Sequence, residues 1–321
     1  MAAPEPTQPP PLFTVVMPAY QAAGTIAIAL RSVLAQTEQR FELIVVDDGS
    51  PDDSATVAEA AASGDPRVRI IRQRNSGPAS ARNLGIASGK APFVAFLDAD
   101  DRWSPDLLAR HHAHFRSDFT LGVSFARFCL YDATLTQPGR ISAHVADLHL
   151  AHVMGENPAC TTSNLVARRD VFRDVGGFDA TLTHAEDQEW IARVLSTSAW
   201  CVRGLDAVLV DYRTSTAGLS ADLERMQAGW RLMIERVRSY APHKATAAER
   251  QASALFERYL ARRALRTGQP AWRACAHLLA AIRHSPRTLI THSPKRTALT
   301  IAGVFAAAIL PASLVRAAIT R

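Results

Sequence analysis

The sequence predicts an α/β fold: a mixed, mostly parallel β-sheet flanked by helices and followed by a basic helical region. Two observations support this prediction. Between residues 12 and 115, short apolar runs alternate with helical patterns across short connections, which is typical of a parallel sheet covered on both faces. Charge then divides the chain, because residues 223–321 hold 17 Lys and Arg but only four Asp and Glu. We therefore expect a disordered Pro-rich tail (1–11), an α/β domain (12–220) and a basic helical region (221–321).

The composition excludes several classes of protein. With 321 residues, 48% apolar and 21% charged, the chain is long enough for a substantial core and is not globally disordered. The four cysteines lack CxxC spacing, which argues against a disulfide framework or a Cys-based zinc site and suits a reducing compartment. The first 11 residues hold five prolines, and we expect no secretory signal there.

Four strands are predicted in the first half of the chain, each a short apolar run bounded by turn residues. They are expected at residues 13–17, 43–46, 67–72 and 92–97. Helical patterns follow the first two, and a Gly-punctuated loop with a short helix (75–89) precedes the fourth. In such a sheet, ligands bind beyond the carboxyl ends of the strands. Two acidic clusters, Asp47–Asp48 and Asp98–Asp101, lie at such ends.

The second half is a mixture of strands and helices before the pattern becomes helical. The expected elements are a helix over 105–115, strands over 123–131, 164–167 and 200–212, and a helix over 186–197 that follows a GGFD turn (176–179). From about residue 221 the pattern is helical, with a helical hairpin over 259–285 that turns at 267–270.

Asp98 and Asp100 stand two positions apart beyond a predicted strand, so an extended segment would place both carboxylates on one side of the chain. Two neighbouring carboxylates repel each other unless a cation lies between them. Mg²⁺ or Mn²⁺ fits such a pair, because these cations take oxygen ligands and leave positions open for phosphate oxygens. The alternative is a helix cap, since Asp101 and Ser104 precede the helix expected at 105–115.

Further polar residues also have two interpretations. Asp48 can accept a hydrogen bond from a base N–H or a ribose hydroxyl, or it can cap the turn after its strand. Glu186 and Asp187 lie at a predicted helix N-terminus, which favours carboxylates electrostatically; the functional alternative is a general base that takes a proton from a hydroxyl. Arg82 and Asn83 can supply phosphate or sugar contacts, the alternative for Arg82 being a solvated helix face.

The basic region indicates a partner of negative charge. After Glu257 the chain holds eleven Arg and Lys and no Asp or Glu, which favours an anionic membrane surface over a merely solvated basic face. Few aromatics stand among these arginines and no nucleic-acid-binding motif is apparent, so we expect no nucleic-acid partner. Residues 297–315 carry no charge but contain Pro311. An interfacial helix at about 296–316 is therefore favoured over a membrane span or a helix packed on the protein.

A set of motifs in the chain resembles the family 2 glycosyltransferases with the GT-A fold. The motifs are VVMPAY (15–20), ALRSVLAQT (29–37), FELIVVDDGS (41–50), NSGPASARNLGIASG (75–89), FVAFLDADDRWSPDLL (93–108), GGFD (176–179), AEDQEWIARVL (185–195) and DYR (211–213). Each is short, but their order over about 200 residues is specific. The resemblance implies a nucleotide-sugar-binding catalytic domain over 12–220, a Mn²⁺ or Mg²⁺ ion and an inverting transfer.

The resemblance also implies roles for individual residues. The donor-binding residues would be Pro18, Ala19 and Tyr20 at the nucleobase, Asp48 at the base or ribose, Asp98 at the ribose, and Arg82 and Asn83 in the preceding loop. Asp100 would hold the metal against the diphosphate, and Asp187 would be the catalytic base. Glu186 is a supporting candidate, while Tyr212 and Arg213 would close over the donor.

These implications predict a metal-dependent, non-processive transferase. The Q-x-x-R-W motif of processive members does not follow the predicted base, and no multi-span region is found. The donor would be a nucleotide sugar, with a UDP-sugar favoured. The acceptor would be a glycan or a lipid-linked hydroxyl in cell-surface or lipid-linked glycan synthesis. We expect a cytoplasmic enzyme, peripheral at the inner face of the plasma membrane.

Three other functions account for part of the pattern. A receiver-like signalling module also places carboxylates at strand ends around Mg²⁺, but it gives Glu186 and Asp187 no purpose. A nucleotidyltransferase on a similar sheet would usually have a Gly-rich basic loop near the first strand, whereas residues 19–25 hold one Gly and no Lys or Arg. A non-catalytic relative that anchors a partner at the membrane is disfavoured by the intact Asp98, Asp100 and Asp187.

Overall fold

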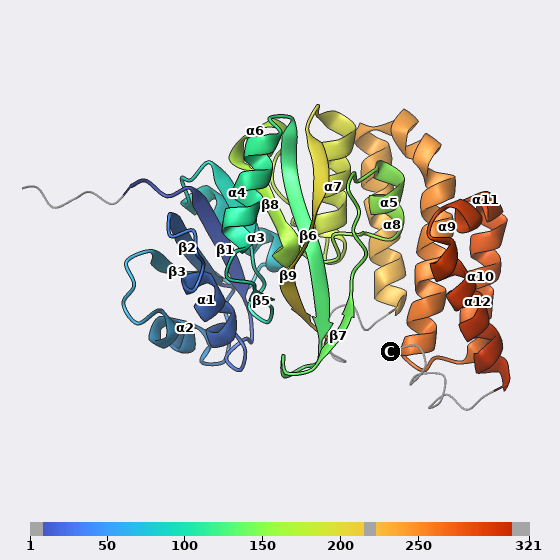
Figure 1. Cartoon of the computed structure of the whole chain (residues 1–321), viewed down its shortest axis with the longest axis horizontal. Coiled ribbons are helices and arrows are strands. Elements are labelled where there is room, and N and C mark those ends of the chain that lie inside the picture. Colours follow the sequence, from blue (N-terminus) through green and yellow to red (C-terminus); the bar gives the residue numbers. More distant parts are fainter. Residues whose placement is uncertain (1–8, 215–222, 310–321) are drawn as a thin grey trace, which may run out of the picture.

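The computed structural model describes residues 9–214 and 223–309, and its architecture confirms the predicted α/β class. Within these residues, nine strands form one mixed sheet in the order β3-β2-β1-β4-β8-β6-β9-β5, with β7 paired to β6 beside this path (Figure 1). The strands are β1 (Phe13–Ala19), β2 (Phe41–Asp47), β3 (Val68–Arg72), β4 (Phe93–Phe96), β5 (Arg102–Trp103), β6 (Leu121–Tyr131), β7 (Pro138–Ile141), β8 (Leu165–Arg168) and β9 (Cys201–Arg213). The helices are α1 (Ile26–Leu34), α2 (Ser54–Ala62), α3 (Pro78–Ser88), α4 (Leu107–Ser117), α5 (Leu150–Gly155), the 3₁₀-helix η1 (Thr162–Asn164), α6 (Arg169–Val175), α7 (Glu186–Thr197), α8 (Leu223–Tyr240), α9 (Pro242–Arg266), α10 (Ala271–His284), α11 (Pro286–Thr291) and α12 (Pro294–Ile309).

The four strands predicted in the first half, β1 to β4, are confirmed, and they pair in parallel. Both faces of β1, β2 and β4 are buried, which explains their continuous apolar runs. Along β1, Val15 and Met17 share a core with α1, whereas Val16 packs against α3 on the other face. Helix α3 lies so close to β1 that a Cβ on Gly85 would stand 2.3 Å from Val16 Cγ1. Glycine here lets α3 lie directly over the strand.

The second half of the sheet has mixed directions. β8 is antiparallel to β4 and β6, β9 is parallel to β6, and β5 is antiparallel to β9. The helix predicted at 105–115 is observed as α4, two residues later, because Asp106 rather than Ser104 precedes its first turn. The sequence predicts no element between residues 132 and 163, where the structure has β7, α5 and η1.

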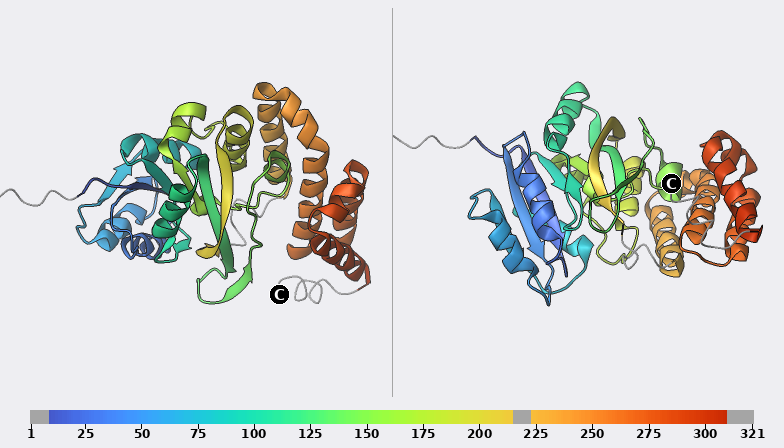
Figure 2. Two further views of the ribbon diagram at one scale, coloured as in Figure 1. Left: turned by 45° about the horizontal axis from the view of Figure 1, so that its top comes forward. Right: turned by 60° about the horizontal axis from the view of Figure 1, so that its bottom comes forward.

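Helices α9 to α12 gather at one end of the molecule, coloured orange to red in Figures 1 and 2. The predicted turn at 267–270 is confirmed, because α9 ends at Arg266 and α10 begins at Ala271. Helix α8 and the first part of α9 share a core with α7, in which Met233, Val237 and Ala245 belong to the same cluster as Trp190. The helical region is therefore packed against the element that carries Asp187.

No helix within residues 9–214 and 223–309 has both the length and the hydropathy needed to cross a membrane. Helix α12 forms the first part of the interfacial segment predicted at about 296–316. The rest of that segment, from residue 310, lies outside the described residues, as do residues 1–8 of the predicted tail. The four cysteines are all described and all free.

Candidate active site

The carboxyl ends of β1, β2 and β4 meet at one edge of the sheet. In the register of β1 and β2, Ala19 lies opposite Asp47, so Tyr20 and Asp48 leave the two strands side by side. Pro18 and Ala19 form the end of β1, and the ring of Tyr20 is exposed beyond it. An exposed aromatic ring offers a surface on which a base can stack. The nucleobase contact of Pro18, Ala19 and Tyr20 stays a prediction.

Asp48 holds the loop that leads into α3. Its buried carboxylate accepts hydrogen bonds from Gln73 Nε2 at 2.6 Å and from the backbone N–H groups of Ser76 and Gly77, each at 2.8 Å. Gly77 has φ = +87°, a conformation that favours glycine, and α3 begins directly after it. A carboxylate has about four acceptor positions, and these three hydrogen bonds leave about one for a ligand. Contact of Asp48 with a base or ribose stays a prediction.

Arg82 on α3 joins two segments that are far apart in the sequence. Its side chain donates to Asp98 Oδ1 at 2.7 Å and to Glu186 Oε1 at 2.8 Å, and its guanidinium lies 5.8 Å from the centre of the Phe178 ring. The residue is only 5% exposed, so it is not on a solvated helix face. Burial lowers the pKa of Arg82, but the charges of Asp98 and Glu186 outweigh this effect and raise the pKa. Arg82 is a permanent cation between two carboxylates.

Asp98 lies beyond the end of β4 and is held from two sides. Besides the ion pair with Arg82, its carboxylate accepts hydrogen bonds from Thr161 Oγ1 at 3.3 Å and from Thr162 Oγ1 at 3.1 Å. Its backbone N–H donates to Ser163 Oγ at 3.0 Å. The orientation of this carboxylate is thus fixed by α3 and by the segment before β8.

Asp100 and Asp101 have opposite environments. Asp101 is buried and accepts hydrogen bonds from Ser163 Oγ at 2.6 Å and from the Arg213 N–H at 2.9 Å. It is therefore not the cap of α4. Asp100 is exposed, yet the protein atoms around it and the charge of Asp98 raise the pKa of its carboxyl to about 6. Asp100 is the carboxylate of this cluster that is open to a ligand.

The end of β9 lies over this acidic cluster. Arg213 Nε donates to the backbone oxygen of Asp100 at 2.6 Å, and Arg213 also donates to the backbone oxygen of Ala133. Burial, together with the charges of Cys160, Asp101 and Asp100, holds the pKa of Tyr212 well above its usual value. Tyr212 and Arg213 are thus neighbours of the predicted metal ligand. Their closure over a donor stays a prediction.

Asp187 lies in the first turn of α7, the position that the sequence predicts for it. Its Oδ2 accepts a hydrogen bond from Asn157 Nδ2 at 3.2 Å. Burial and the adjacent charge of Glu186 raise the pKa of Asp187 to about 7, and Arg82 opposes this rise. A carboxylate that can take up a proton near neutral pH has the property required of a general base.

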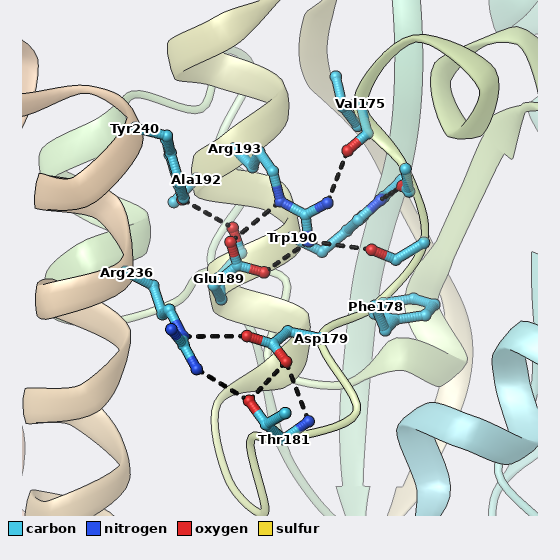
Figure 3. Close-up of polar contacts among 12 residues, drawn as sticks. Val175, Phe178, Asp179, Thr181, Glu189, Trp190, Ala192, Arg193, Arg236 and Tyr240 are labelled. Carbon is cyan, nitrogen blue, oxygen red and sulfur yellow. Dashed lines mark hydrogen bonds and ion pairs between the residues drawn. The ribbon is translucent and has the colours of Figure 1, made fainter.

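The turn before α7 is held by a network of polar contacts (Figure 3). Trp190 Nε1 donates to the Gly176 oxygen at 3.0 Å, and Arg193 donates to the Val175 oxygen at 2.6 Å. Arg236 on α8 pairs with Asp179 at 3.1 Å. These contacts tie the GGFD turn (176–179) to α7 and α8, and they hold the start of α7 in place.

Asn83 belongs to the same supporting structure. Its Nδ2 donates to the Phe178 oxygen at 2.8 Å, and its Oδ1 accepts from the Phe178 N–H at 2.9 Å. Both polar atoms of Asn83 therefore bind the turn. A direct contact with a donor stays a prediction, and the geometry favours a positioning role.

Sequence reasoning missed the segment 156–163. It supplies Asn157 to Asp187, Thr161 and Thr162 to Asp98, and Ser163 to Asp101. Its three consecutive hydroxyl residues, just before a strand, were an available signal, because such side chains often serve as hydrogen-bond donors to buried carboxylates. These contacts are not predictable from local patterns, because segment 156–163 is far from both acidic clusters along the chain.

The donor set fits a divalent cation that a substrate completes. Within the described residues, no group of three or more His, Cys, Asp or Glu side chains forms a metal cage. Asp98 is occupied by Arg82 and two threonines, which leaves Asp100 as the available protein ligand. Mg²⁺ is commonly bound by one or two carboxylates together with substrate phosphates and water. The residues therefore fit such an ion.

Asp48, Asp98 and Asp100 follow parallel strands of the sheet, at the edge where ligands bind in sheets of this kind. The sequence model of the family described as "Glycosyl transferase family 2" matches residues 14–176, about half of the chain. The chain belongs to this family.

Two curated relatives illustrate the extent of the similarity. The chain is 34% identical over 202 residues to the succinoglycan biosynthesis protein ExoU of Rhizobium meliloti, which covers 58% of this chain and 57% of ExoU. It is 39% identical over 100 residues to the uncharacterized glycosyltransferase EpsJ of Bacillus subtilis, covering 31% and 29%. The chain thus spans little more than half the length of ExoU.

Solved structures match over a larger part of the chain. TarS residues 1–349 of S. aureus, in complex with UDP, gives a TM-score of 0.59 at 18% identity and covers 91% of this chain and 89% of that one. The mannosyltransferase PcManGT from Pyrobaculum calidifontis, in complex with GDP-Man and Mn²⁺, gives 0.63 at 17% identity and covers 97% and 85%. These similarities confirm the GT-A-type fold.

Proposed function

We propose that this chain transfers a single sugar from a nucleotide sugar, with a UDP-sugar favoured, to an acceptor hydroxyl with inversion of configuration. One observation carries the proposal: Arg82 binds both Asp98, a predicted donor contact, and Glu186, the neighbour of the predicted base Asp187, which supports a single site. The names of relatives such as ExoU support a role in the synthesis of a cell-surface or lipid-linked glycan.

Donor binding is assigned to the carboxyl edge of the sheet. The base would contact the β1 end (Pro18, Ala19, Tyr20) and Asp48, and the ribose would contact Asp98. The nucleotides in the TarS and PcManGT structures support a donor of this class. Asp100 would hold Mn²⁺ or Mg²⁺, which when bound offsets negative charge on a diphosphate. Arg213, close to Asp100, would add positive charge on the same side.

Asp187 is proposed as the general base. Its carboxylate would take the proton of the acceptor hydroxyl while the hydroxyl oxygen bonds to the anomeric carbon and the nucleoside diphosphate leaves. Asn157 holds one oxygen of Asp187, which leaves the other available for the hydroxyl. Glu186, paired with Arg82, keeps a negative charge beside Asp187 and thereby maintains its basicity.

Membrane association is a further part of the proposal. The terminal helices carry exposed apolar side chains, namely Trp272 and Leu279 on α10 and Leu299 and Phe305 on α12. Basic residues lie among them, such as Arg283 on α10. Apolar side chains surrounded by arginines suit the interface of an anionic membrane. We infer a peripheral enzyme at the cytoplasmic face, where nucleotide sugars are at hand.

Two of the three alternatives predict different ligands. A receiver-like module would accept a phosphoryl group from a small phosphodonor, and a nucleotidyltransferase would bind a nucleoside triphosphate and a sugar phosphate. Membership of the glycosyltransferase family disfavours both.

The test is a panel of UDP- and GDP-sugars with Mn²⁺, scored by thermal shift and by donor hydrolysis. We expect one nucleotide class to stabilise the protein, Asp100→Ala to remove this stabilisation, and Asp187→Asn to keep it while abolishing turnover. Asp53→Asn, an exposed residue before α2, is the matched control. Absence of binding to every nucleotide sugar, or wild-type transfer by Asp187→Asn, would contradict the proposal.

A further inference from the structure

A cluster of arginines surrounds one carboxylate where α5 meets α9 and α12. Glu156 follows α5 and is 12% exposed at its side chain. It pairs with Arg258 at 2.8 Å, with Arg262 at 3.2 Å and with Arg296 at 3.0 Å. Three cations therefore share a single anion in a partly buried place.

Two more arginines add to this excess of positive charge. Arg266 lies one turn beyond Arg262 on α9, and Arg140 extends from β7. Neither of these makes a hydrogen bond or an ion pair with any described residue. Burial lowers the pKa of Arg262, and the charges of Arg266, Arg296 and Arg140 lower it further, while Glu156 opposes them. Glu156 is thus the carboxylate that pairs with three of these five arginines, while Arg140 and Arg266 add charge that it does not pair.

The cluster is directly connected to the predicted base. Asn157, which donates to Asp187 at 3.2 Å, is the residue next to Glu156. Gly155, on the other side of Glu156, lies against α9 so closely that a Cβ there would stand 2.9 Å from the Ala252 oxygen. Three successive residues therefore join α9, the arginine cluster and the base. The surrounding protein and the charge of Asp187 also raise the pKa of the Cys160 thiol, while Arg266 lowers it, so both charges act on one side chain.

We propose that Arg140, Arg262 and Arg266 form a subsite for a phosphate or diphosphate group on the acceptor. This inference rests on the proposed function, because it takes Asp187 as the group that receives the acceptor hydroxyl. Guanidinium groups bind phosphate oxygens in a bidentate way, and a bound phosphate would remove the repulsion among the arginines. The donor diphosphate is assigned elsewhere, to Asp100 at the edge of the sheet. We therefore assign a phosphate bound at these arginines, next to the segment that supplies Asn157 to Asp187, to the acceptor.

The probe is inorganic pyrophosphate, titrated into the full chain that is already saturated with UDP and Mn²⁺. Thermal shift and calorimetry measure its binding while the donor site is filled. We expect wild-type protein to bind pyrophosphate in addition to UDP. The Arg262→Gln/Arg266→Gln variant should bind it at least about tenfold more weakly, since charged hydrogen bonds are lost. Arg266→Gln alone removes no contact of the fold and should give a smaller loss.

The matched control is Arg283→Gln/Arg287→Gln, which removes two exposed arginines from α10 and α11. It should bind pyrophosphate as the wild type does. Equal binding by the Arg262→Gln/Arg266→Gln variant, or absence of binding by the wild type, would overturn the subsite. Loss of UDP affinity in that variant would also overturn it, because the arginines would then serve the donor.

Vesicles separate an acceptor phosphate from a membrane headgroup. We expect the Arg262→Gln/Arg266→Gln variant to float with phosphatidylglycerol-containing vesicles as well as the wild type. Loss of flotation with intact pyrophosphate binding would assign the arginines to lipid headgroups and refute the subsite. Failure of the proposed function is distinguishable, because it would appear as absent donor hydrolysis in the wild type while the pyrophosphate titration is unaffected.

Discussion

Replacement of Arg82 by glutamine tests whether one buried cation holds the candidate active site together. The substitution removes ion pairs of 2.7 and 2.8 Å and leaves Asp98 and Glu186 without their cation. Loss of one partner of a buried pair typically costs about 3–5 kcal/mol. Asp98 keeps its two threonine hydrogen bonds, so we expect a loss near the lower end, about 3 kcal/mol. Urea denaturation at neutral pH measures it.

The control is Arg40→Gln. Arg40 pairs with Glu38 at 2.8 Å, but its side chain is 43% exposed, and solvent-exposed ion pairs contribute little to stability. A double variant, Arg82→Gln with Glu186→Gln, should recover part of the loss because it removes one of the unpaired charges. If Arg82→Gln lowers the unfolding free energy by as little as Arg40→Gln does, Arg82 does not link α3, β4 and α7 as described.

Four further predictions concern the base, the packing of α5 and the terminal helices. Transfer should rise about tenfold per pH unit below neutrality and level off above an apparent pKa of about 7, since Asp187 must be ionised to act; a flat profile between about pH 5 and 8 would contradict this. Because the pKa of Asp187 is raised to about 7 in the folded protein, this residue lowers stability progressively from about pH 4 to about pH 7 and fully above that, so Asp187→Asn should raise the melting temperature at pH 8 by several degrees. This gain should shrink as the pH falls and vanish near the unfolded value of about 4, which calorimetry can follow. Gly155→Ala should lower the unfolding free energy by about 1–3 kcal/mol through overpacking against α9, and an unchanged urea midpoint would exclude that contact. Leu299→Ser/Phe305→Ser should weaken flotation with anionic vesicles and leave UDP binding unchanged; full flotation would remove α12 from the membrane surface.

Much of the first half of the fold is predictable because it depends on local patterns. The parallel strands β1, β2 and β4 are buried on both faces, so each is a continuous apolar run that ends in polar residues. Asp48 and Asp98 stand at those ends, and parallel pairing brings the ends to one edge. The start of α7 is also predictable, because Glu186 and Asp187 open a clear amphipathic pattern.

The contacts that complete the candidate site are not local, and this is why the sequence does not predict them. The residues next to Arg82 in the sequence form a helix in either case, whether its side chain faces water or binds Glu186. Glu186 lies 104 residues further along the chain, so local patterns do not reveal the contact. Asp101 has the spacing of a helix cap, but tertiary contacts with Ser163 and Arg213 decide its environment. Segment 156–163 has no periodic pattern, since its residues are placed by the side chains they bind rather than by a helix or a strand.

The short path from Gly155 to Ser163 has a practical consequence for protein engineering. Its two ends contact different parts of the fold. Gly155 packs against α9, and Ser163 binds the acidic loop after β4. A chimaera that took its terminal helices from another transferase, but kept residues 155–163 of this chain, would lose the ion pairs between Glu156 and the arginines of α9 and α12. Recombination designed to alter acceptor choice should therefore exchange the terminal helices together with residues 155–163.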